Sequence, residues 1–75
     1  MSERVELGRF MYAEPSVDGY WTIRNVKTKA TLGWVEWDSS RRQHVLTPDV
    51  LTDFSADCLD EISAFLKRLN AERGK

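Results

Sequence analysis

Two side chains of this sequence have the types needed for nucleophilic catalysis, the single cysteine Cys58 and the single histidine His44. A thiol becomes a nucleophile when an imidazole in contact with it takes its proton. The apolar spacing around Cys58 places its thiol on the buried side of a helix, whereas strand alternation directs His44 to the far face of a sheet. We therefore do not expect the two to meet, and Cys58 is interpreted as a buried, inert thiol.

Acidic side chains are the next candidates, because carboxylates bind hard cations. Five acids and no base lie between residues 46 and 65: Asp49, Asp53, Asp57, Asp60 and Glu61. They lack the oxygen-ligand spacing and the glycine of a calcium loop, and no His or Cys cluster accompanies them. The four glycines are scattered, so no phosphate-binding loop is indicated. We expect no metal, no cofactor, no small-molecule substrate and no enzymatic activity, and we interpret the acids as solvating and capping the start of a helix.

Length and composition indicate one small domain spanning residues 1–75. A chain of 75 residues buries only a small core, and one cysteine cannot form an internal disulfide. The first residues contain no apolar run of signal-peptide length, and no stretch approaches the ~18 apolar residues of a membrane span. The expected location is the cytoplasm, with no membrane contact.

The clearest predicted element is an amphipathic helix over about residues 55–72. Ser55 is a good N-cap, since its hydroxyl can accept a hydrogen bond from a first-turn N–H. Phe54 and Leu59 stand at the two positions of a hydrophobic staple. The apolar residues that fall on one stripe of this helix are Cys58, Leu59, Ile62, Phe65, Leu66 and Leu69. One stripe predicts one packing partner.

Strand patterns fill the chain before the helix. The predicted strands cover roughly residues 5–13, 20–27, 32–38 and 42–47, the first being the least regular because of Gly8. Short connections between them imply an antiparallel meander. The predicted fold class is α+β, a three- to four-stranded antiparallel sheet packed on one face by a single C-terminal helix.

Alternation along these strands assigns side chains to two faces. Trp34 and Trp37 are an odd number of positions apart, so they point to opposite faces. The more apolar set, assigned to the helix side, is Trp21, Ile23, Val35, Trp37 and Val45. The opposite face then carries Tyr20, Thr22, Arg24, Val26, Leu32, Trp34, Glu36, His44 and Leu46.

That second face is more aromatic than an ordinary solvent surface. Three explanations stay open. The N-terminal segment could fold over it as a fourth strand or flap, a second copy could cover it in a homodimer, or a partner protein could bind there.

Nucleic-acid binding is the alternative functional class. Four basic side chains lie at or near hairpin ends, where they can contact phosphates: Lys27, Lys29, Arg41 and Arg42. The aromatic rings of the second face could stack on nucleobases. Against this, the net charge of the chain is −1, and Glu36 lies within the supposed binding face.

Three runs of the sequence form a recurring pattern: Leu32-Gly-Trp-Val-Glu-Trp37, Arg42-Gln-His-Val-Leu-Thr-Pro48, and Phe54 with Cys58-Leu59-Asp-Glu-Ile62-Ser-Ala-Phe65. Together they resemble small uncharacterised proteins encoded by bacteria and their phages or prophages. The resemblance covers roughly residues 20–70 and implies an antiparallel meander followed by one C-terminal helix. It consists of core positions and carries no catalytic residue across.

Small phage proteins often bind proteins of the bacterial host, so this resemblance favours a role in protein binding. The predicted function is a small non-catalytic protein-interaction or regulatory module, with a partner protein or a second copy as its ligand. The predicted contact residues are Tyr20, Trp34, Leu46, Arg41, Arg42 and His44.

Overall fold

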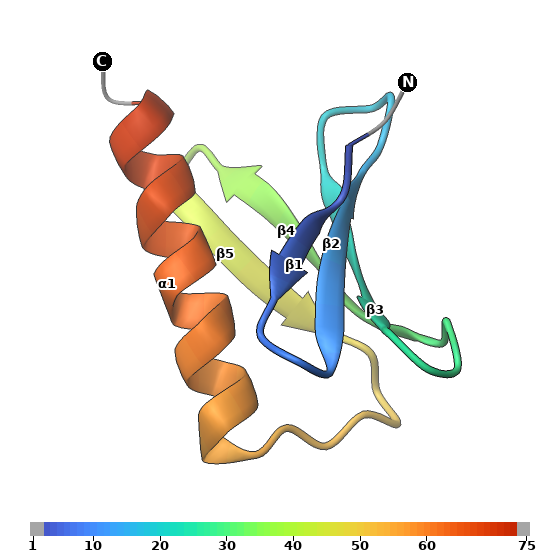
Figure 1. The fold of residues 1–75 in the computed structure, drawn as a ribbon. Helices are drawn as coiled ribbons and strands as arrows, with labels where there is room; N and C mark the ends of the chain where they lie inside the picture. Colours follow the sequence, from blue (N-terminus) through green and yellow to red (C-terminus); the bar gives the residue numbers. More distant parts are fainter. Residues whose placement is uncertain (1–2, 74–75) are drawn as a thin grey trace.

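Five antiparallel strands and one helix make up the fold in the computed structural model, which describes residues 3–73 (Figure 1). The elements are β1 (Val5–Leu7), β2 (Met11–Pro15), β3 (Trp21–Asn25), β4 (Thr31–Asp38), β5 (Gln43–Pro48) and α1 (Ala56–Arg73). The strand order is β1-β2-β3-β4-β5, so each strand pairs with the next along the chain. The predicted α+β class, with an antiparallel sheet packed against a C-terminal helix, is confirmed. The predicted number of strands was too low, since the described residues form five.

The extra strand comes from the N-terminal segment that was predicted as one strand. Gly8 has a φ of 78°, which glycine adopts without a Cβ penalty, and it lies in the turn that reverses the chain after β1. Leu7 then pairs with Met11, and Val5 with Ala13. The resulting hairpin continues the sheet beside β3. It does not fold across the second face as the flap considered above.

The core lies between the sheet and one stripe of α1. Its buried members are Leu7, Met11, Ala13, Ile23, Val35, Ile62 and Phe65. The Trp21 ring meets the Phe65 ring edge to face, with centroids 5.1 Å apart. Burying an aliphatic or aromatic side chain of this size contributes about 1.5–3 kcal/mol, so these few residues supply much of the fold's stability. The predicted helix-side positions Ile23 and Val35 are both fully buried.

The register of β5 shows that its two faces were assigned the wrong way round. Leu46 pairs with Val35 and His44 with Trp37. Directly paired residues of antiparallel strands share a face, so Leu46 and His44 point to the helix side. Val45 pairs with Glu36 on the opposite face. The prediction failed because β5 has apolar residues on both faces, and a one-residue shift exchanges them.

A β-bulge in β4 changes the facing of one more residue from the predicted one. Ile23 pairs with Gly33, but the next pair is Arg24 with Thr31, so Leu32 is an extra residue. Leu32 packs against the core, and its predicted place on the opposite face is wrong. Gly33 is needed here because a Cβ would lie 2.8 Å from the carbonyl oxygen of Thr47.

The start of α1 agrees with the predicted cap. The backbone N–H of Cys58 donates to the Ser55 hydroxyl at 3.2 Å, and the N–H of Leu59 donates to the Ser55 carbonyl at 3.0 Å. Ser55 is therefore the N-cap of a helix that begins at Ala56. Leu59 is 48% exposed, so its predicted place on the buried stripe of the helix is wrong.

The direction of the strands divides the molecule into two ends. Because neighbouring strands run antiparallel, the β1–β2 turn, the β3–β4 turn and the loop from β5 to α1 lie at one end of the sheet (Figure 1). The β2–β3 and β4–β5 turns lie at the other end, together with the C-terminal end of α1. Segments that are distant in sequence are thereby brought to the same end.

Candidate functional site

The sheet face away from α1, here called the outer face, is mostly polar. By register, its members are Glu6, Tyr12, Glu14, Thr22, Arg24, Thr31, Trp34, Glu36, Asp38, Gln43, Val45 and Thr47. The Arg24 guanidinium donates to Glu14 at 3.2 Å and to the Thr31 hydroxyl at 3.1 Å. Trp34 is half-buried between Thr22 and Thr47. Trp34 and Tyr12 are thus the two aromatic residues of a face that the sequence had suggested to be more aromatic.

Tyr12 is covered by cationic side chains. Its ring is buried although it lies on the outer face. The Arg4 guanidinium lies 4.3 Å and the Lys29 ammonium 5.5 Å from the ring centroid. Cations over an aromatic face are attracted to its quadrupole. Lys29, which was predicted as a phosphate contact, is therefore positioned by an intramolecular interaction.

The six predicted protein-contact residues do not form one surface. Trp34 is on the outer face, whereas Leu46 and His44 face α1. Tyr20 is half-buried just before β3, and the pair Arg41 and Arg42 lies in the β4–β5 turn. The structure separates these residues because β5 has the opposite facing from the one predicted.

The four predicted nucleic-acid contacts are also divided. Lys27 and Lys29 lie in the β3–β4 turn, and Arg41 and Arg42 in the β4–β5 turn. These turns are at opposite ends of β4, whose eight residues span about 26 Å. The four bases therefore do not form a single basic patch.

Asp38 further reduces the positive charge of the β4–β5 turn. Its Oδ1 accepts from the backbone N–H of Arg41 at 3.2 Å and from the Ser40 hydroxyl at 3.1 Å. These two hydrogen bonds, the Arg41 N–H first, lower the pKa of Asp38 below its ordinary value. Arg41 Nε is 3.7 Å from Oδ2. The carboxylate thus stays ionised next to the arginines.

His44 is used to attach β5 to the helix. The backbone N–H of His44 donates to Asn70 Oδ1 at 2.7 Å, and His44 Nδ1 is 2.8 Å from the same oxygen. A carboxamide oxygen cannot donate, so Nδ1 carries a proton. The imidazole also contacts the Trp37 ring edge to face at 5.3 Å, and the Arg73 guanidinium covers that ring at 3.8 Å.

Cys58 and His44 are far apart, although not for the predicted reason. His44 contacts Asn70, which is twelve residues after Cys58 in α1 and so about 18 Å along its axis. A thiol–imidazole pair cannot form across that distance. Residues 3–73 also contain no group of three or more His, Cys, Asp or Glu side chains placed to hold a metal ion.

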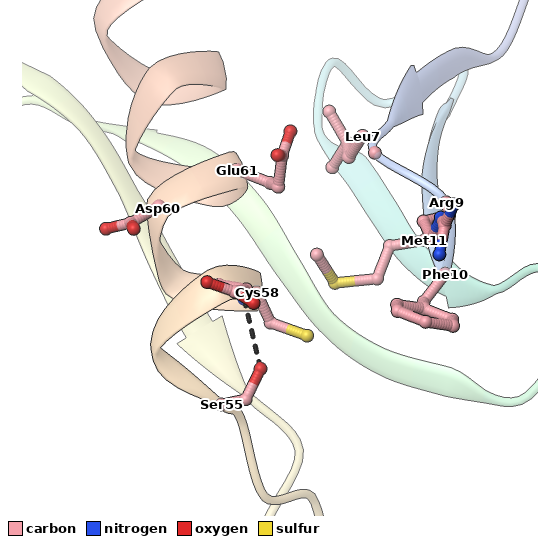
Figure 2. Close-up of a pocket in the computed structure, with 10 residues that line it drawn as sticks. Leu7, Arg9, Phe10, Met11, Ser55, Cys58, Asp60 and Glu61 are labelled. Carbon is pink, nitrogen blue, oxygen red and sulfur yellow. Dashed lines mark hydrogen bonds between the residues drawn. The ribbon is translucent and has the colours of Figure 1, made fainter.

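A groove that the sequence did not indicate opens between the β1–β2 turn and the start of α1 (Figure 2). Its volume is about 340 Å³, and it is lined by Leu7, Gly8, Arg9, Phe10, Met11, Ser55, Asp57, Cys58, Asp60 and Glu61. In Figure 2 the Cys58 thiol and the Met11 thioether approach each other from the two walls. Asp57, Asp60, Glu61 and Arg9 are its charged lining residues, and the Asp60 carboxylate points away from the groove in Figure 2. Asp57 and Glu61 against Arg9 leave an excess of negative charge, which favours a cationic ligand.

Exposed apolar side chains lie in the segments at this end of the molecule, and one of them, Phe10, lines the groove. Phe10, in the β1–β2 turn, is 59% exposed. Val50 and Leu51, in the loop before α1, are 95% and 91% exposed. With Leu59 on the first turns of α1, these residues are called the apolar end. The signal that could have indicated it is the pair Val50-Leu51, two apolar residues in a loop between Pro48 and Asp53.

Comparisons of the chain with protein-family models, with curated proteins and with solved structures gave no match. The described residues include no helix with both the length and the apolar character needed to cross a membrane.

Proposed function

We propose that this protein is a non-catalytic protein-interaction module that binds a partner protein through its apolar end. The observation that carries the proposal is that Phe10, Val50, Leu51 and Leu59 are exposed in segments at one end of the molecule, where Phe10 also lines the groove. Large apolar side chains gathered on a surface mark contact sites, because the transfer of apolar surface out of water lowers the free energy. Protein binding is also the function predicted from the sequence, but the proposed contact surface is the apolar end and not the six residues predicted for it.

The absence of catalysis is part of this proposal and follows from how the reactive side chains are used. His44 is held by Asn70, and its imidazole is distant from the Cys58 thiol. Cys58 is half-buried in the groove between apolar neighbours, where a thiol behaves as a small hydrophobic group.

The resemblance to small phage and prophage proteins favours a protein of the bacterial host as the partner. This origin remains a proposal. We expect the bound segment of that partner to be basic and apolar, since Asp57 and Glu61 line the groove and Arg9 is the one base among its lining residues.

Selection from a displayed random peptide library tests the proposal with a defined probe. We expect the selected peptides to combine apolar residues with Lys or Arg. Phe10→Ser should weaken their binding about tenfold or more, because an apolar anchor is lost. Val17→Ser is the matched control, since Val17 is fully exposed in the β2–β3 turn at the opposite end.

Two outcomes would contradict the proposal. One is that no selected peptide loses affinity in Phe10→Ser compared with Val17→Ser. The other is a homodimer in sedimentation velocity that dissociates in Phe10→Ser, because a second copy would then occupy the surface assigned to the partner.

A further inference from the structure

The two edges of the sheet are treated differently by the fold. β5 is one edge strand, and α1 packs along it. Asn70 of this helix accepts the backbone N–H of His44 at 2.7 Å, so a hydrogen-bonding group of that strand is already used. The β5 edge is therefore covered. β1 is the other edge strand, and the helix makes much less contact with it (Figure 1).

A continuous groove follows the β1 side of the helix. The groove described above adjoins a second hollow of about 150 Å³, and the two share Leu7 and Glu61. The second hollow is lined by Val5, Glu6, Leu7, Glu61, Ala64, Phe65 and Arg68. Together they form the β1–α1 groove, which extends from the N-cap of α1 past its middle. Its buried apolar members are Leu7, Met11 and Phe65.

An edge strand beside an apolar groove can accept an additional strand. Each edge strand presents N–H and C=O groups that its single neighbour does not use. Charged side chains, Lys above all, and Pro protect such edges, and Val5-Glu6-Leu7 contains one exposed charged residue, Glu6, but no Lys or Pro. β1 has only three residues, so it offers few ladder hydrogen bonds. Side-chain contacts in the groove must therefore provide much of the affinity.

The charge of the groove determines which charged side chains a bound strand should have. Asp57 and Glu61 come from α1, and Arg9 is the base on the opposite wall. Arg68, in the second hollow, is paired with Glu72 at 3.2 Å. An incoming strand with Lys or Arg between its apolar residues would match this excess of carboxylates.

We propose that a basic, extended segment of the partner adds to β1 as a sixth strand and fills the β1–α1 groove. Alternate apolar side chains of this segment enter the groove over Leu7 and Met11, and its cations meet Asp57 and Glu61. The inference rests on the proposed function and adds the mode of binding and the chemistry of the bound segment.

Nuclear magnetic resonance on the full ¹⁵N-labelled chain tests this mode. The probe is a short synthetic peptide in which Lys alternates with Leu or Val. We expect amide exchange in β1 to slow by tenfold or more when the peptide binds, with strand-type NOEs between peptide and β1. A peptide with Glu in place of Lys should not bind.

Charge variants separate the groove from the rest of the surface. The double variant Asp57→Asn, Glu61→Gln should weaken binding of the Lys peptide about tenfold and reduce its dependence on salt. Asp18→Asn, Glu36→Gln is the control with the same change in charge, because both residues are exposed away from the groove. A heteronuclear correlation spectrum of each variant verifies that the fold is kept.

Three results would overturn the inference. The first is peptide binding without protection of β1 and with shifts confined to Phe10, Val50 and Leu51, which would leave the proposed function standing. The second is equal weakening by the two charge variants. The third is no binding of the Lys peptide at millimolar concentration, in which case the library selection alone decides the proposed function.

Discussion

Arg42 ends the turn between β4 and β5 in a backbone conformation that residues other than glycine rarely adopt. Its φ is 58°, and its N–H donates to the Asp38 carbonyl at 2.7 Å, which closes the turn. Lys29, with a φ of 64°, has a similar conformation in the β3–β4 turn. A left-handed residue with a Cβ costs about 1–2 kcal/mol relative to its right-handed form. Both turns therefore carry local strain where a basic side chain is presented.

Replacing Arg42 by glycine should stabilise the fold. The left-handed conformation then has no Cβ penalty, and part of the gain is offset by the greater freedom of glycine in the unfolded chain. We expect the free energy of unfolding to rise by about 0.5–1 kcal/mol in urea denaturation. Arg41→Gly is the control, because Arg41 lacks the positive φ and should only be destabilised. A midpoint for Arg42→Gly at or below that of the wild type would contradict this.

The helix is held to the sheet by two kinds of contact. Along its middle, Ile62 and Phe65 are buried against the strands. Near its C-terminal end, the attachment is polar, since Asn70 Oδ1 accepts from both the backbone and the imidazole of His44. This second contact fixes the position of α1 over the β5 edge, and thereby which side of the sheet has the open groove.

Asn70→Ala should loosen this attachment. It removes the acceptor for two donors, and each such hydrogen bond contributes about 0.5–1.5 kcal/mol. We expect a loss of about 1–3 kcal/mol in the free energy of unfolding, and faster exchange of the His44 amide. Asn70→Asp keeps an acceptor oxygen at the same position and should lose less. Equal losses in the two variants would show that the hydrogen bonds are not what holds the helix end.

Among the elements, those defined by a local sequence pattern could be predicted, and the helix is the clearest case. Ser55 and the stripe through Ile62 and Phe65 define α1 without reference to the rest of the fold. The facing of His44 could not be predicted, because it depends on the register between β5 and β4. The bulge at Leu32 is likewise a property of strand pairing.

The groove was beyond prediction for a related reason. Its walls come from the β1–β2 turn, around Phe10, and from the start of α1, around Cys58. These segments lie in opposite halves of the chain, and no spacing pattern in the sequence connects them. Only the meander, which returns the chain to the same end after β5, brings them together (Figure 1).

The free energy of unfolding of the whole molecule is limited by its short chain. Native domains are stable by about 0.05–0.15 kcal/mol per residue, or about 4–11 kcal/mol for a chain of 75 residues. The buried core cluster has only seven apolar residues. Apolar side chains that remain exposed at the apolar end contribute little to the fold, so their presence needs another reason. Binding is the reason we propose.

Two phenylalanines test this division between folding and binding. Phe65 is 3% exposed and Phe10 is 59% exposed. Phe65→Ala leaves a cavity and should cost about 3–5 kcal/mol, close to the entire stability at the lower end of the range above. Phe10→Ala should change the free energy of unfolding by less than about 0.5 kcal/mol, as surface substitutions do. Thermal and urea denaturation of both variants measure these costs, and a similar loss in the two would mean that Phe10 serves the fold rather than a partner.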